Sequence, residues 1–81
     1  MNTSDEALEQ IVLAEVKTIA FRQVQKDEPL LTSNVVDSIG LVDLLVALEK
    51  KFSIRIDANS VNPQNFNTVT DIVRLVKGKI Q

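Results

Sequence analysis

The sequence predicts an all-α fold, a bundle of three longer helices and one short helix with a long loop after the first helix. Apolar residues recur at helical spacing in three stretches of the 81-residue chain. Only two glycines and two prolines are present, which argues against a turn-rich all-β fold. A chain of this length has room for one domain, so we expect residues 1–81 to form a single domain.

The first helix is expected from Ser4 to Gln25. Thr3 and Glu6 have the spacing of a capping box, which opens a helix. The apolar stripe that follows consists of Leu8, Ile11, Val12, Val16, Ile19 and Ala20. Lys26 to Asp37 is expected to be a loop, because Pro29 and the polar residues after it interrupt the helical period. A loop of this length in so small a domain is often functional.

The second helix is expected from Asp37 to Phe52, and on a helical wheel it carries two apolar stripes. The core stripe consists of Leu41, Leu44, Leu45, Leu48 and Phe52. The second stripe consists of Ile39, Val42 and Val46. A helix in a small bundle needs only one stripe for the core, and burial of both is hard to arrange in a domain of this size. The second stripe is therefore predicted to face a partner.

The last third of the chain is predicted to contain an extended connection and two helices. Ile54 and Ile56 alternate with polar residues, but no neighbouring strand is available to pair with them, so we expect both to pack on the core. Asn62 and Pro63 predict a very short helix that ends at about Phe66.

A capped helix is expected to end the chain. Thr68 precedes an apolar period and is followed three residues later by Asp71, the arrangement of an N-terminal cap. The stripe predicted to be buried consists of Val69, Ile72, Val73, Val76 and Ile80.

Missing residue types exclude several functions. With no Cys and no His, the chain has no disulfide, zinc site, Cys nucleophile or Ser-His-Asp triad. The absence of Tyr and Trp leaves little for stacking on bases, and a net charge of −2 gives no electrostatic case for nucleic acid. No metal site is expected, and a small enzyme is the weakest hypothesis because no catalytic constellation is recognisable.

The charges are distributed unevenly along the chain. Residues 1–49 carry nine acids and three bases, whereas residues 50–81 carry two acids and six bases. This asymmetry indicates either an acidic face for partners or a solvated surface whose charges happen to sort by sequence. The apolar runs are too short for a membrane span, and the N-terminus lacks the basic region of a signal peptide. We therefore expect a cytoplasmic protein. We also expect it to be a monomer.

The candidate site is Ser38, at the start of the second predicted helix. Asp and Ser before an apolar period are commonly just N-caps. However, the unpaired N–H groups and the dipole of a helix start favour an anion, so a phosphate esterified to Ser38 would be well placed. Ser38 also borders the second stripe, so an attached group would emerge beside an apolar surface. Without a His as base, Ser38 is a poor candidate for an activated nucleophile.

Asp37-Ser38-Ile39 resembles the Asp-Ser-Leu attachment motif of acyl carrier proteins and of the related peptidyl and aminoacyl carrier domains. The likeness covers nearly the whole chain, and its other parts include Ala47-Leu48-Glu49, Phe52 and the tail from Asn62 to Val69. The resemblance implies the four-helix carrier-protein bundle, with phosphopantetheine transferred from coenzyme A to Ser38 by a phosphopantetheinyl transferase. It also implies that the arm's thiol carries acyl or aminoacyl groups as thioesters, and that the chain itself is not an enzyme.

The implied partners are ligases or synthases that load acyl or aminoacyl groups, in lipid or secondary metabolite biosynthesis. Gly40, Lys50 and Lys51 depart from the acidic second helix of fatty-acid carriers, and residues 35–40 are closer to discrete D-alanyl and aminoacyl carriers. A specialised pathway is therefore expected, with the cargo left open. The residues predicted to recognise partners are Asp37, Ile39, Leu41, Asp43, Val46 and Glu49. The alternative is a helical protein-interaction module in which Ser38 is only an N-cap.

Overall fold

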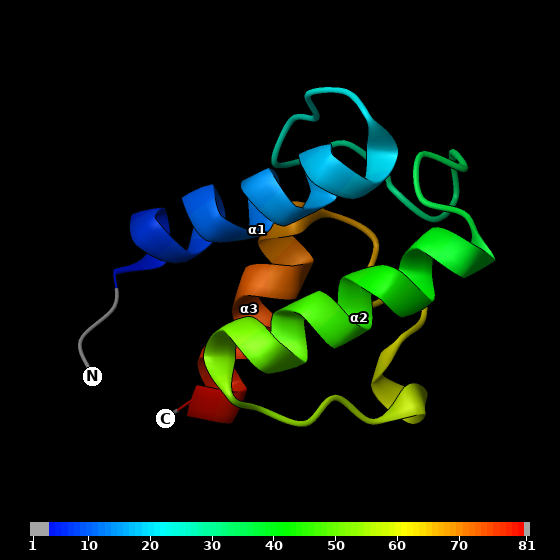
Figure 1. Cartoon of the computed structure of the whole chain (residues 1–81). Coiled ribbons are helices and arrows are strands. Elements are labelled where there is room, and N and C mark those ends of the chain that lie inside the picture. Colours follow the sequence, from blue (N-terminus) through cyan, green and yellow to red (C-terminus); the bar gives the residue numbers. More distant parts are fainter. Residues whose placement is uncertain (1–3, 81) are drawn as a thin grey trace.

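The computed structural model describes residues 4–80 and contains three α-helices (Figure 1). Helix α1 spans Asp5–Ala20, α2 spans Ser38–Phe52, α3 spans Val69–Ile80, and a 3₁₀ turn, η1, spans Ala58–Ser60. Helix α1 contacts both α2 and α3, and the end of α1 and the start of α2 lie on the same side of the molecule (Figure 1). Residues 4–80 contain no strand, so the predicted all-α class is confirmed. None of the helices described is both long enough and apolar enough to cross a membrane.

Side chains cap the starts of α1 and α3. Ser4 is the N-cap of α1, and its side chain accepts a hydrogen bond from the N–H of Ala7. Thr3, the first member of the predicted capping box, lies outside the described residues. At α3 the predicted cap is confirmed: the Thr68 hydroxyl accepts from the N–H of Asp71 at 3.0 Å, and the Asp71 carboxylate accepts from the N–H of Thr68 at 3.1 Å. This reciprocal pair satisfies two N–H groups at the helix start.

The end of α1 differs from the prediction. The helix ends at Ala20, whereas the sequence indicated Gln25. Phe21 takes the left-handed conformation, with φ at 61°, and its N–H donates to the carbonyl of Lys17. This conformation reverses the chain and ends the helix. The periodic apolar pattern stops at Ala20, and Val24 packs against the core from the loop rather than from a continued helix.

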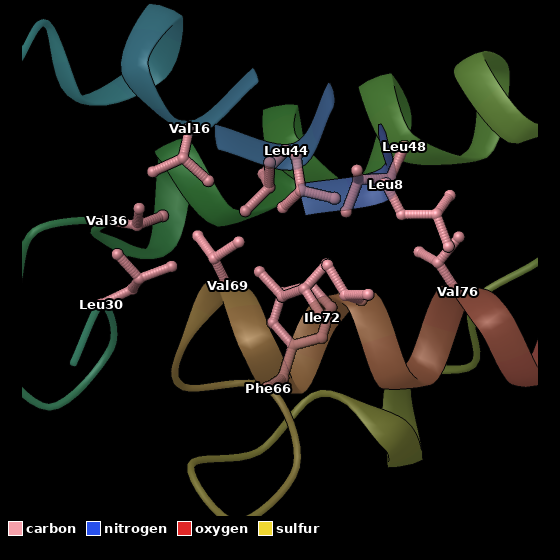
Figure 2. Packing of buried hydrophobic residues seen from close by; sticks show 12 residues of the cluster. Leu8, Val16, Leu30, Val36, Leu44, Leu48, Phe66, Val69, Ile72 and Val76 are labelled. Carbon is pink, nitrogen blue, oxygen red and sulfur yellow. The ribbon is translucent and has the colours of Figure 1, made fainter. Parts of the chain in front are cut away.

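Apolar side chains from all three helices and from the loops fill the interior (Figure 2). In this view Leu44 and Leu48 of α2 lie across from Ile72 and Val76 of α3. The twelve buried apolar residues among those described are Leu8, Val12, Val16, Leu30, Val36, Leu44, Leu48, Phe66, Val69, Ile72, Val73 and Val76. These contacts confirm the core stripe of α2, whose other members are partly buried around the same cluster.

The second stripe of α2 is exposed, as predicted. Ile39 is 76% exposed, Val42 58% and Val46 44%. The predicted stripe of α3 is buried except at its last member, Ile80, which is 36% exposed at the end of the helix. The placement of Ile80 in the core was therefore wrong.

The connection between α2 and α3 agrees with the prediction in part. Ile54 and Ile56 are half-buried against the core, and no strand forms there. Residues 62–66 do not form a short helix. They form a single turn in which the N–H of Phe66 donates to the carbonyl of Asn62 at 2.8 Å. The chain leaves the helical path because the Phe66 side chain is buried in the core. The 3₁₀ turn lies earlier, at η1.

Replacement of Leu48 by alanine tests the assignment of the core stripe. The Leu48 side chain is completely buried, so Leu48→Ala should lower the free energy of unfolding by about 2–5 kcal/mol through lost burial and a residual cavity. Urea denaturation followed by circular dichroism measures the loss. Val42→Ala, on the exposed stripe of the same helix, should change stability by less than about 0.5 kcal/mol. Equal losses in the two variants would contradict the assignment.

Candidate functional site

The site is built around the first residues of α2. Asp37 is the N-cap: its backbone is extended, and its Oδ1 accepts a hydrogen bond from the N–H of Gly40 at 2.7 Å. Ser38 is therefore the first helical residue, one position inside the cap, and its side chain is exposed. The alternative hypothesis made Ser38 the N-cap of this helix. That assignment is wrong, because Asp37 is the N-cap.

The Ser38 hydroxyl is free to carry a group. Within residues 4–80 no hydrogen bond engages it. It lies at a helix start, where unpaired N–H groups and the helix dipole favour negative charge. A phosphodiester on this oxygen would gain that favourable field without displacing an existing contact. The residues present thus fit a phosphate-linked prosthetic group such as phosphopantetheine.

Gly40 allows α2 to approach α1 closely at the site. A Cβ on Gly40 would lie 3.1 Å from Cγ2 of Ile19 and 3.2 Å from Oδ1 of Asp37. The capping bond fixes that Oδ1, so it can hardly move aside. The glycine that the sequence marked as a departure from acidic carriers therefore has a packing reason, which the sequence alone did not show.

Asn67 anchors the loop that leads into the site. Its carbonyl accepts from the N–H of Leu30 at 2.6 Å, and its Oδ1 accepts from the N–H groups of Leu31 and Thr32 at 2.9 and 3.2 Å. The N–H of Val36 in turn donates to the carbonyl of Leu30. One residue just before α3 thus holds the loop that positions Asp37 and Ser38. Sequence reasoning missed this residue, because nothing in an asparagine before a capping threonine indicates a partner more than thirty positions away.

Two further contacts brace the earlier part of the loop. The carbonyl of Lys26 accepts from both the N–H and the hydroxyl of Thr70. Glu28 pairs with Arg22, and this guanidinium, together with the N–H of Gln25, holds the pKa of the Glu28 carboxyl below its ordinary value. A lowered pKa in the folded state means that the pair stabilises the fold above the ordinary carboxyl pKa and that this contribution is lost as the pH falls.

The structure separates the six residues predicted for partner recognition into two groups. Asp37, Ile39, Asp43 and Val46 are exposed. Leu41 is half-buried and packs against the core. Glu49 is also half-buried, and its Oε2 accepts from the N–H of Ile56 at 2.8 Å, so it ties α2 to the following connection. Leu41 and Glu49 therefore contribute more to the packing of the fold than to the exposed surface around Ser38.

An open hollow of about 420 Å³ lies beside the site, between the end of α1 and the start of α2. Its walls are formed by Thr18, Ile19, Phe21, Asp37, Ile39, Gly40 and Asp43. Three of these residues surround Ser38 in the sequence. Phe21, which sequence reasoning placed inside a longer first helix and did not connect with the site, forms part of the opposite wall.

The fold and the site together define a class of protein: a small helical carrier with an exposed serine at a helix start beside an unpartnered apolar stripe. Comparison with known families agrees, because the family model described as the phosphopantetheine attachment site matches residues 10–76. The chain therefore belongs to the family of phosphopantetheine-binding carrier proteins, and its prosthetic group is covalently bound phosphopantetheine.

The individual relatives of this chain include D-alanyl carrier proteins. A D-alanyl carrier protein of Streptococcus uberis is 42% identical over 52 residues, which cover 64% of this chain and 66% of that protein. D-alanyl carrier proteins of Streptococcus pyogenes serotypes M5 and M49 are each 41% identical over 51 residues, covering 63% of this chain and 65% of theirs. The chain thus spans just under two thirds of the length of these curated relatives.

Replacement of Asn67 tests its hold on the loop. Asn67→Ala should lower the free energy of unfolding by about 1–3 kcal/mol, because the N–H groups of Leu31 and Thr32 lose their acceptor. Hydrogen exchange at those two amides should accelerate, as NMR would show. Asn65→Ala is the matched control, since this asparagine lies two positions earlier and is exposed. Unchanged exchange at both amides in Asn67→Ala would show that the loop is held by other contacts.

Proposed function

We propose that this protein carries aminoacyl groups as thioesters on a phosphopantetheine arm attached to Ser38. One observation carries the proposal: Ser38 is exposed at the start of α2 and its hydroxyl has no hydrogen bond within residues 4–80, because Asp37 is the cap. Membership of the phosphopantetheine-binding family supports the arm, and the D-alanyl carrier relatives support the aminoacyl cargo.

Attachment is a phosphoryl transfer from coenzyme A. The Ser38 oxygen forms a bond to the phosphorus that bears pantetheine, the pyrophosphate bond of coenzyme A breaks, and adenosine 3′,5′-diphosphate leaves. The hydroxyl proton must pass to a base. The chain has no His, and Oδ1 of the adjacent Asp37 accepts from the Gly40 N–H. In this proposal a separate phosphopantetheinyl transferase brings coenzyme A and the base, and this chain supplies the acceptor oxygen in an accessible place.

The chain acts as a carrier and leaves chemistry to its partners. It contains no Cys, so the sulfur that forms the thioester is the thiol of the arm. The partners proposed are the transferase and a ligase that loads the aminoacyl group, in a specialised pathway of the cytoplasm. Docking is proposed around Ser38, on Ile39 and Val46 of the second stripe, with Asp43 beside them.

The packed interior favours a small cargo. Leu44 and Leu48 of α2 and Val69 of α3 are buried in the core, with exposed fractions of 1% or less. A long acyl chain would enter only if α2 and α3 parted along Leu45 and Val69, with loss of those contacts. An aminoacyl group is short and polar, so it can remain in solvent at the end of the arm.

Intact mass tests the attachment residue. Wild-type protein incubated with coenzyme A and a phosphopantetheinyl transferase should gain the mass of one phosphopantetheine, and Ser38→Ala should gain none. Since Asp37 is the cap, Ser38→Ala should change stability by less than about 0.5 kcal/mol.

Ser33→Ala and Ser53→Ala are the controls and should be modified like the wild type. A gain that persists in Ser38→Ala would overturn the assignment. A wild type that gains no mass would instead favour a helical interaction module that uses the second stripe.

Loading assays test the cargo. Protein that carries the arm should be loaded with D-alanine by a streptococcal D-alanine ligase and ATP, as detected by intact mass and by release with hydroxylamine. A fatty acyl ligase supplied with a long-chain acid should load it at least tenfold more slowly. Faster loading by the fatty acyl ligase would contradict the aminoacyl assignment while leaving the attachment at Ser38 intact.

A further inference from the structure

Phe21 combines two features that are unusual for a phenylalanine. Its side chain is 92% exposed, the most exposed large apolar side chain among the described residues. Its backbone is left-handed, with φ at 61°. Glycine and asparagine adopt this conformation readily, whereas a bulky residue there is an outlier. Among residues 4–80, the other two non-glycine residues with positive φ are Asn34 and Ser53, both small and polar.

The phenyl ring contributes little to the fold. The N–H of Phe21 closes α1 by donating to the carbonyl of Lys17, and any residue but proline could supply that N–H. With most of its surface in water, the ring buries almost no apolar area against the rest of the protein. The presence of phenylalanine at this position therefore calls for a contact outside the chain.

The position of Phe21 indicates where that contact is made. Phe21 and Ile39 both line the open hollow beside the start of α2, and both are largely exposed. Asp37 and Asp43 line the same hollow, and neither takes part in an ion pair within residues 4–80. Ser38 lies between Asp37 and Ile39 in the sequence, so the hollow adjoins the attachment residue.

We propose that Phe21 and Ile39 form one docking surface for the phosphopantetheinyl transferase, which inserts an apolar side chain into the hollow and places a basic group against Asp37 and Asp43. This inference rests on the proposed attachment at Ser38. The transferase is the partner that must bring a reacting phosphorus to the Ser38 oxygen, so it must cover the surface next to that residue. The ligase also docks near Ser38, but its reacting atom is the thiol at the far end of the arm, so the transferase alone must cover the surface directly beside the Ser38 oxygen.

Charge gives a second reason to expect the transferase at this docking surface. Coenzyme A is a polyanion, and two carboxylates beside Ser38 would repel it. A basic group of the enzyme, placed against Asp37 and Asp43, removes that repulsion when the complex forms. The apolar contact between the hollow and the enzyme then sets how long the complex lasts.

The test is a pair of matched substitutions in full-length protein. Phe21→Asn puts a residue suited to the left-handed conformation at the end of α1 and removes the ring. Ser53→Asn makes the same kind of change at the end of α2, about 22 Å along the helix from Ser38. The readouts are the melting temperature and the kinetics of phosphopantetheine transfer by a broad-specificity bacterial transferase with coenzyme A, followed by intact mass.

Phe21→Asn should raise the melting temperature by a few degrees and raise KM for the carrier about tenfold, with kcat changed less than twofold. Phe21→Leu, which keeps an apolar side chain, should have an intermediate KM, and Ser53→Asn should leave KM unchanged.

An unchanged KM in Phe21→Asn would overturn the proposed docking surface. A raised KM with a lowered melting temperature would assign the ring a structural role and would also overturn it. If the wild type itself gains no mass, the proposed function fails. That result is distinct from the two outcomes for Phe21→Asn, because both of those require a wild type that is modified.

Discussion

The hydrogen bond from the Gly40 N–H to Oδ1 of Asp37 fixes where α2 begins, and the rest of the site depends on it. It makes Asp37 the cap and leaves Ser38 as the first helical residue, exposed and with no hydrogen bond to its hydroxyl from the part of the chain that the structure describes. The same oxygen lies against Gly40, where α2 packs against Ile19 of α1. A local hydrogen bond and a contact between two helices therefore both set the start of α2, and together they hold Ser38, the proposed attachment residue, in one place.

Patterns that depend on neighbouring residues were predictable from the sequence. The division of α2 into a core stripe and an exposed second stripe follows from helical periodicity, and the structure places Leu48 and Ile39 as expected. The capping box of Thr68 and Asp71 is likewise a local pattern, and both of its hydrogen bonds form. Ser38 was found by its residue type at a helix start, a signal that also lies within a few positions of the sequence.

Features that depend on contacts between distant residues were not predictable. The hold of Asn67 on Leu31 spans 36 positions, and the packing of Gly40 against Ile19 needs the relative placement of two helices. The inward contact of Glu49 depends on the path of the chain after α2, so a residue predicted for partners binds the backbone of Ile56 instead. In each case the sequence showed the residue but not its partner.

The central claim is that Ser38 carries the phosphodiester outside the packed core. Two-dimensional ³¹P–¹H NMR of protein bearing the arm tests it directly. The account predicts a phosphodiester ³¹P resonance correlated with the β-protons of Ser38, with amide shifts confined to the first turn of α2 and unchanged methyl signals from Leu44 and Leu48. A correlation with the β-protons of another serine, or shifts spread through the core methyl groups, would contradict it.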